Sequence, residues 1–166
     1  MSIPLAAIGA VVAALLETSV LPELTVAGAK PDLVFILALL ATLMIGFEDG
    51  LAWAFVGGLM LDLLTPSRQL GATSLTLLFV VGAGSIAGRL LPARRIPVAV
   101  LAVFVLGWLY QWLMAFVLGF SAGVTTLPSP AAVAPAVVFD TILAVPFAAG
   151  ALVLWRRFGQ PERMEW

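Results

Sequence analysis

The chain has 166 residues, of which 63% are hydrophobic and only 10% are charged, and its mean hydropathy of +1.16 is that of an integral membrane protein. A formal net charge of -1 provides no basic surface for nucleic acid. The absence of both Cys and His excludes disulfides, thiolate nucleophiles, imidazole bases and the ordinary zinc and haem sites. We therefore expect no catalytic, cofactor-binding or metal-binding residues.

Six apolar runs follow one another along the chain, most of them close to the length at which a helix crosses about 30 Å of hydrocarbon. The second and third runs are short, about 22 Å each as helices, and we expect them to extend into their flanks or to lie in thinned bilayer. The sequence thus predicts an all-α integral membrane protein. It forms a single transmembrane domain, 1–166, folded as a compact bundle of six helices at residues 3–21, 32–46, 51–65, 70–91, 96–120 and 131–155.

Lys and Arg are distributed unevenly between the two ends of this predicted bundle. If the N-terminus is inside, the outer loops hold only Lys30 and Arg68. The inner segments hold six basic residues, namely Arg89, Arg94, Arg95, Arg156, Arg157 and Arg163. Because cytoplasmic loops are enriched in basic residues, both termini are predicted to be cytoplasmic. Trp53 and Trp155 then fall at the inner interface, where aromatic belts form.

The first run has a second interpretation as a cleaved signal peptide, because residues 27–29 (AGA) are small residues suited to a peptidase. However, no Lys or Arg precedes its apolar core, and Glu17 lies inside it. These two features favour a retained first helix.

Acidic residues within the runs coincide with stripes of small side chains. Counting back in fours from Asp62 gives Gly58, Ala54 and Gly50, which share one face of a helix. Small residues let backbones approach closely in lipid, so we expect this face to pack on another helix and to tolerate Gly58→Ala far better than Gly58→Leu. Similar stripes accompany the other two intramembrane acids, with Ala132, Ala136, Ala144 and Ala148 beside Asp140, and Ala6, Ala10 and Ala14 beside Glu17.

Counting along the helices places Glu17, Asp62 and Asp140 in the same, outer half of the bilayer, within about 13 Å of the outer helix ends. Lys30 and Arg68 lie at the same level. We predict that the acids face a polar, partly hydrated cavity open to the periplasm, where they contact a lipid headgroup, a ligand or a partner, with Lys30 or Arg68 as compensating charge. The alternative is that each acid only caps or hydrogen-bonds a neighbouring helix.

Residues 31–33 (PDL), 57–64 (GGLMLDLL) and 70–71 (LG) resemble, in order and spacing, the rod shape-determining protein MreD family. The resemblance implies a non-enzymatic scaffold of the bacterial cell-elongation complex, or elongasome, in the cytoplasmic (inner) membrane, supporting lateral peptidoglycan synthesis and rod shape. Its implied partners are MreC and, through the complex, MreB, the glycosyltransferase RodA and a class B penicillin-binding transpeptidase. It also implies a fold similar to the substrate-binding S components of energy-coupling factor transporters.

That second similarity provides the alternative function, an S component that binds a vitamin or a metal. The Ala-x-x-x-Ala pattern over residues 6–14 resembles the face by which S components dock on their coupling partner, although such patterns are common in any tightly packed helix. An enzyme is disfavoured, because Ser74 and Ser85 have no evident activator. The carboxylate pair at residues 48–49 falls in a predicted inner turn, where we expect solvated side chains.

Trp108 and Trp112 are four residues apart, so both rings lie on one face of the fifth predicted helix, near mid-membrane. One interpretation is core packing, and the other is a rigid aromatic surface for a partner helix such as that of MreC. Gln111 would then face the bundle or another helix. A homodimer is also compatible with the sequence.

Overall fold

The computed structural model describes residues 3–21, 30–66, 69–90, 96–123 and 127–158. These residues form α1 (Ile3–Ser19), α2 (Leu33–Met44), α3 (Phe47–Ala52), the π-helical turn η2 (Trp53–Gly57), α4 (Gly58–Leu64), α5 (Ala72–Leu90), α6 (Ile96–Ala122) and α7 (Pro130–Phe158). Because α3, η2 and α4 follow one another without a break, they make one rod. The described part of the chain therefore contains six helical rods and no strand, which confirms the predicted all-α bundle of six helices.

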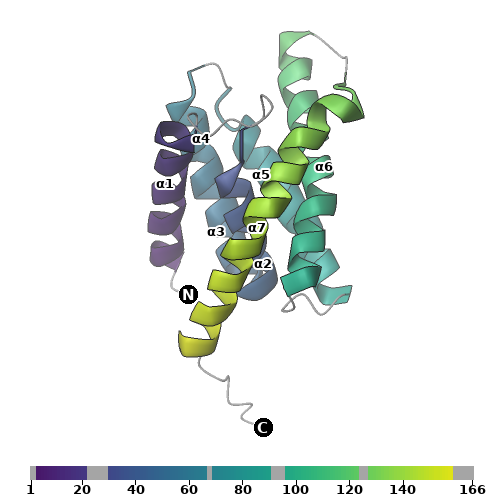
Figure 1. Ribbon diagram of the computed structural model, residues 1–166. Coiled ribbons are helices and arrows are strands. Elements are labelled where there is room, and N and C mark those ends of the chain that lie inside the picture. Colours follow the sequence, from purple (N-terminus) through teal and green to yellow (C-terminus); the bar gives the residue numbers. More distant parts are fainter. Residues whose placement is uncertain (1–2, 22–29, 67–68, 91–95, 124–126, 159–166) are drawn as a thin grey trace.

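The rods run alternately up and down, so that α1 begins at the same end of the bundle at which α7 ends (Figure 1). We call this the terminal end, and its opposite the far end. Apolar segments long enough to cross a membrane lie in α5, α6 and α7, at Ala72–Arg89, Ile96–Phe120 and Pro130–Val153. In contrast, α2 has 12 residues. At about 1.5 Å per residue it extends only ~18 Å, so it cannot reach both faces of a hydrocarbon layer about 30 Å thick.

The short helix α2 is the centre of the bundle. All of its residues except Leu37 are buried, and it contacts α1, α3, η2, α5, α6 and α7. Its sequence, LVFILALLATLM, is apolar on every face, which is the pattern of a helix buried on all sides. Phe35 stacks on Tyr110 of α6 with ring centroids 4.8 Å apart. The other five rods thus enclose α2.

The third rod begins at Phe47 and not at residue 51 as predicted, which shortens the turn before it to Ile45 and Gly46. Glu48 and Asp49 therefore lie in the first turn of α3 and not in a loop. Carboxylates are favoured in a first turn because they face the positive end of the helix dipole. The local charge pattern thus explains the earlier helix start.

The small residues of the third rod lie at contacts with other helices. Gly50 adjoins Thr42 of α2, and Ala54 is fully buried. A Cβ on Gly58 would lie 2.6 Å from the Cα of Ser74 in α5. The absence of a side chain at Gly50 and Gly58 therefore allows the rod to approach both α2 and α5.

The turn η2 changes which residues of the third rod face its neighbours. A π-helical turn widens the helix by one residue, and Gly57 as well as the following glycine reaches an interface, where it meets Val34 and Ala10. Trp53, in the same turn, lies over Gly9 of α1, where a Cβ would be only 2.8 Å from the indole Cζ2. Trp53 thus packs against α1, and its place in an interfacial aromatic belt stays a prediction.

Some sequence-based predictions fall outside the described residues. They concern the small residues at 27–29 and the side chains of Arg68, Arg94, Arg95, Trp155, Arg156, Arg157 and Arg163. Arg89 is described and exposed, and it lies in the last turn of α5, at the terminal end. Its position agrees with the predicted excess of basic residues at that end.

Candidate functional site

The start of α2 is held by acidic side chains from other helices. Glu17 of α1 accepts a hydrogen bond from the Val34 N–H through Oε2, at 2.8 Å. Asp140 of α7 accepts one from the Asp32 N–H through Oδ1, also at 2.8 Å. The first amides of a helix have no partner within it and carry partial positive charge. Two carboxylates from outside the helix therefore stabilise the start of α2.

Asp62 plays the same part at the start of α5. Its Oδ2 accepts hydrogen bonds from the N–H groups of Gly71, at 2.9 Å, and Thr73, at 3.1 Å. The residue is only 3% exposed. Gly71 has a φ of +90°, a conformation that glycine adopts without steric cost and that lets the chain turn into α5. The carboxylate near the end of the third rod thus joins α4 to α5.

Asp32 lies at the N-cap position of α2, but its side chain makes no capping hydrogen bond there. Its Oδ2 instead accepts a hydrogen bond from Nε2 of Gln111 in α6, at 2.8 Å. Gln111 therefore faces the bundle, one of the two orientations expected for it. Asp32 was not among the predicted cavity residues, because an acid after Pro31 and before an apolar run also marks an ordinary N-cap.

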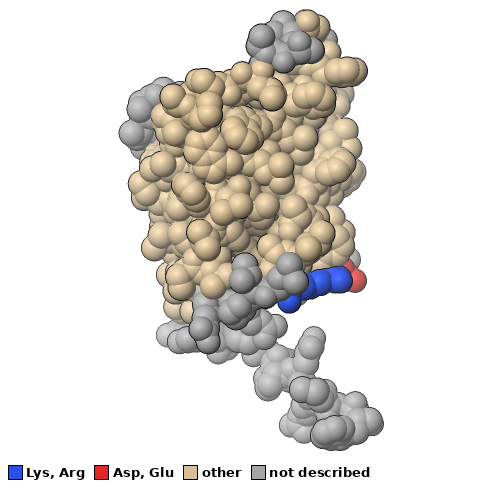
Figure 2. All heavy atoms as spheres, turned by 90° about the vertical axis from the view of Figure 1, so that its right-hand side faces the viewer, with Lys and Arg blue, Asp and Glu red and all other residues tan. Residues whose placement is uncertain are grey.

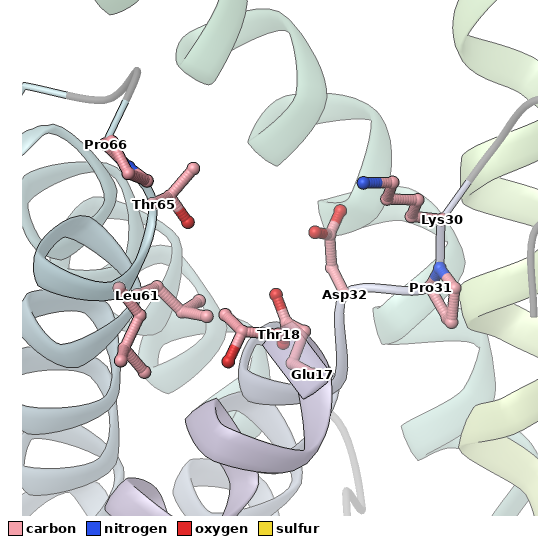
Figure 3. A pocket seen from close by; sticks show the side chains of 9 residues that line it. Glu17, Thr18, Lys30, Pro31, Asp32, Leu61, Thr65 and Pro66 are labelled. Atoms are coloured by element: carbon pink, nitrogen blue, oxygen red, sulfur yellow. The ribbon is translucent and has the colours of Figure 1, made fainter. Parts of the chain in front are cut away.

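A pocket of about 250 Å³ lies at the far end, beside these groups (Figure 3). It lies between the end of α1, the segment that leads into α2, and the end of α4 with the residues after it. Its lining consists of Glu17, Thr18, Lys30, Pro31, Asp32, Leu61, Leu64, Thr65 and Pro66. Charged and apolar side chains thus meet in one small space at the end of the bundle.

The pocket contains only some of the residues predicted to share a polar cavity. Glu17 and Lys30 line it, whereas the buried residues Asp62 and Asp140 do not, and Arg68 lies outside the described residues. Asp140 is fully buried, and its Oδ2 has no hydrogen bond to a described group. Each of the three predicted acids accepts a hydrogen bond from a backbone N–H outside its own helix. This is the alternative to the shared cavity that the sequence left open. Contact of any of them with a partner or ligand stays a prediction.

Trp108 and Trp112 lie beside each other on α6, with ring centroids 5.7 Å apart and planes inclined by 60°. Trp112 is 40% exposed and Trp108 is half-buried. The spacing of four continues to Phe116 and Phe120, which are both exposed and have centroids 6.3 Å apart. We call these four residues the α6 aromatic surface. Phe116 and Phe120 were not predicted to belong to this surface, although the sequence has the same spacing of four residues.

The two hydroxyl groups considered as nucleophiles bond to helix backbone. Ser74 Oγ donates to the Phe55 carbonyl at 3.3 Å, and Ser85 Oγ donates to the Gly82 carbonyl at 2.7 Å. Within the described ranges, no group of three or more Asp and Glu side chains is arranged to hold a metal ion.

The alanine stripes are also accounted for by the bundle. Ala6, Ala10 and Ala14 are fully buried, so this face of α1 packs inside the protein and is not exposed for docking on a coupling partner. In the stripe of α7, Ala144 and Ala148 are fully buried beside α2, whereas Ala132 and Ala136 at its start are not. The stripes therefore report internal packing.

Comparison with known proteins identifies the family. No curated protein and no solved structure is significantly similar to the chain, so the similarity to S components of energy-coupling factor transporters has no support. The family model for the rod shape-determining protein MreD matches residues 3–157, a range that contains all three motifs on which the sequence resemblance rested. Because this match covers nearly the whole chain, the protein belongs to the MreD family and is a membrane component of rod shape determination.

Proposed function

We propose that the protein is a non-enzymatic scaffold of the cell-elongation complex in the bacterial inner membrane, with both termini in the cytoplasm. It supports lateral peptidoglycan synthesis by binding MreC and, through the complex, RodA, a class B penicillin-binding transpeptidase and MreB. The observation that carries this proposal is the family match over residues 3–157. The described residues are almost entirely helices with short connections, so partners would be bound mainly by helix faces.

The α6 aromatic surface is the proposed contact for a transmembrane helix of MreC. Among the described residues on the side of the molecule shown in Figure 2, charged side chains are visible only at the lower edge. Lipid is as apolar as a helix face, so association within a membrane depends on close packing more than on hydrophobicity. Trp112 and Phe116 are both well exposed, and their rigid rings offer large contact area with little loss of rotamer freedom.

Co-purification of MreC with the full chain tests this contact. Trp112→Leu removes a ring that is 40% exposed, and we expect it to lower MreC recovery about tenfold, the effect of losing ~1.4 kcal/mol of binding free energy. The matched control is Phe79→Leu, which removes a 70% exposed ring from α5 and should leave recovery unchanged.

The possible outcomes separate the contact from the function. Equal recovery of MreC by the two variants would show that the α6 aromatic surface is not the contact. Failure of the unaltered chain to recover MreC or any wall-synthesis protein, from cells that it restores to rod shape, would overturn the proposed scaffold role itself.

A further inference from the structure

The hairpin of α6 and α7 rises well above the start of α2. Gln111 of α6 and Asp140 of α7 each form a hydrogen bond with Asp32, which directly precedes α2. These three residues therefore lie at one height in the bundle, which we call the polar level. From there α6 continues to Ala122, and α7 begins at Pro130. At about 1.5 Å per residue, each helix extends ~15 Å beyond the polar level toward the far end.

The other helices that reach the far end stop close to the polar level. The first helix, α1, ends at Ser19, just after Glu17, whose carboxylate bonds to Val34 at the start of α2. The end of α4, at Leu64, lines the far-end pocket together with Asp32. Figure 1 accordingly shows the α6–α7 hairpin projecting past the far ends of α1 and α4. The helices at the far end thus form a step, low at α1 and α4 and high at α6 and α7.

The two sides of this step differ in polarity. On the low side, Lys30 is exposed, and Glu17 and Asp32 are half-buried. On the high side, Phe120 is 75% exposed, and positions 96–139 of the sequence hold no charged residue. Charged groups are costly within hydrocarbon, whereas exposed apolar rings are stabilised there. The low side therefore requires headgroups or water at a height at which the high side requires hydrocarbon.

The height of the low side follows from the third rod, which is described from end to end. Glu48 is exposed at the terminal end, and Asp62 adjoins Leu61 of the pocket lining. These two acids are 14 residues apart in the sequence, which is about 21 Å along a helix, and Ile96 to Gln111 in α6 gives ~22 Å. Tilt only shortens these heights. A flat hydrocarbon layer of about 30 Å that begins at Glu48 would therefore extend ~8 Å beyond the polar level.

We propose that the protein thins the bilayer locally where lipid meets α1 and α4, so that headgroups descend to the polar level on that side. Against α6 and α7 the hydrocarbon keeps its full height. Bilayers thin around short spans at a modest cost per Å, and the thinning keeps the charged groups out of hydrocarbon. The partner is thus the far-end leaflet of phospholipid, and no particular headgroup is required.

Lipid is favoured over a protein as the cover of the projecting hairpin. The apolar segments Ile96–Phe120 and Pro130–Val153 have 25 and 24 residues, so each is long enough to cross a membrane and each reaches into the hairpin. The described part of the hairpin therefore has the composition of a membrane span up to its far end. The proposal does not depend on the binding of MreC, because it concerns the chain alone in lipid.

Spin labels at matched heights test the thinning. The chain has no cysteine, so one introduced cysteine gives one label. Leu16→Cys in α1 and Leu109→Cys in α6 replace leucines that are 44% and 42% exposed and that lie just below the polar level, next to Glu17 and Gln111. The labelled full chain is placed in phosphatidylcholine vesicles, and the depth of each label is measured from its relaxation by oxygen and by a water-soluble nickel complex.

We expect the label at position 16 to lie at the headgroups and the label at position 109 to lie at least about 5 Å deeper in hydrocarbon. Longer acyl chains should deepen the label at position 109 and leave the label at position 16 unchanged. Equal depths for the two labels, or equal deepening with longer chains, would overturn the proposal. If Leu16→Cys does not fold, Leu15→Cys, which replaces a leucine 46% exposed on the same helix, gives the same comparison.

A third label determines whether the hairpin lies in lipid. A label at Phe120→Cys should be relaxed less by the nickel complex than a label in water, because this position lies at the upper boundary of the hydrocarbon or in the headgroups. Relaxation equal to that of a fully aqueous label would show that the hairpin leaves the bilayer. That result would overturn the thinning proposal and would instead indicate a protein partner for the hairpin.

Discussion

Replacement of Gly58 by Ala tests how closely α4 and α5 pack. A Cβ at this position would lie 2.6 Å from the Cα and 2.8 Å from the N of Ser74, and these backbone atoms cannot rotate away. Carbon atoms normally approach to about 3.5–4.0 Å, so the two helices must separate by ~1 Å. Such overpacking typically costs about 1–3 kcal/mol, whereas Gly to Ala in a helix gains up to ~1 kcal/mol. We therefore expect a net loss of about 1–2 kcal/mol of folding free energy.

Thermal unfolding in detergent measures this loss, which should lower Tm by roughly 2–8 °C if the scaling for soluble domains of this size applies. The control is Gly82→Ala in α5, where a Cβ would meet no atom within 4 Å, so Tm should be unchanged or raised. Gly58→Leu should lower Tm further than Gly58→Ala. The sequence alone predicted that Ala would be tolerated far better than Leu, and the nearby backbone of Ser74 adds that Ala itself is destabilising. A Gly58→Ala protein as stable as the unaltered chain would refute the close approach of α4 and α5.

Two other changes test the acids and the orientation. Asp62→Ala leaves the N–H groups of Gly71 and Thr73 without their acceptor and should cost about 1–3 kcal/mol, whereas Asp62→Asn keeps an oxygen and should cost less; identical Tm values for the two variants would contradict the capping role. Loss of rod-shape complementation by an Asp62→Asn protein that is stably folded would show that the charge itself is required. Reporter fusions after Arg95 and after Trp166 should both give cytoplasmic signals, because basic residues concentrate at that predicted end, and a periplasmic signal from either would overturn the orientation.

The helices were largely predictable because each apolar run must either be buried in the bundle or face lipid along its whole length. The sequence of α2 has no charged residue and no polar face, which indicates a helix enclosed on all sides. The turn η2 was not predictable. Its π-helical geometry accompanies the packing of Trp53 over Gly9. This contact joins two rods, and the local sequence of neither rod predicts it.

The positions of the acids along their helices could also be predicted, but their partners could not. Glu17 and Asp62 each lie near the far-end terminus of their helix, which requires only counting at about 1.5 Å per residue. Which backbone N–H groups donate to these carboxylates depends on where α2 and α5 begin, and that is a property of the folded bundle. Likewise, Asp32 and Gln111 are 79 residues apart in the sequence, and nothing in either segment marks them as a pair.

The length of α2 explains why an apolar bundle keeps carboxylates at these positions. A helix that is too short to cross the membrane and is enclosed by other helices has its first amides away from bulk water, where an unsatisfied N–H costs several kcal/mol. Glu17 and Asp140 supply acceptors to the backbone at the start of α2, at Val34 and Asp32. Because α1 and α7 provide these acceptors, the hydrogen bonds also fix the position of α2 relative to both helices. The bond from Val34 also orients Glu17 at the wall of the far-end pocket, so the need to cap α2 determines how this carboxylate is placed there.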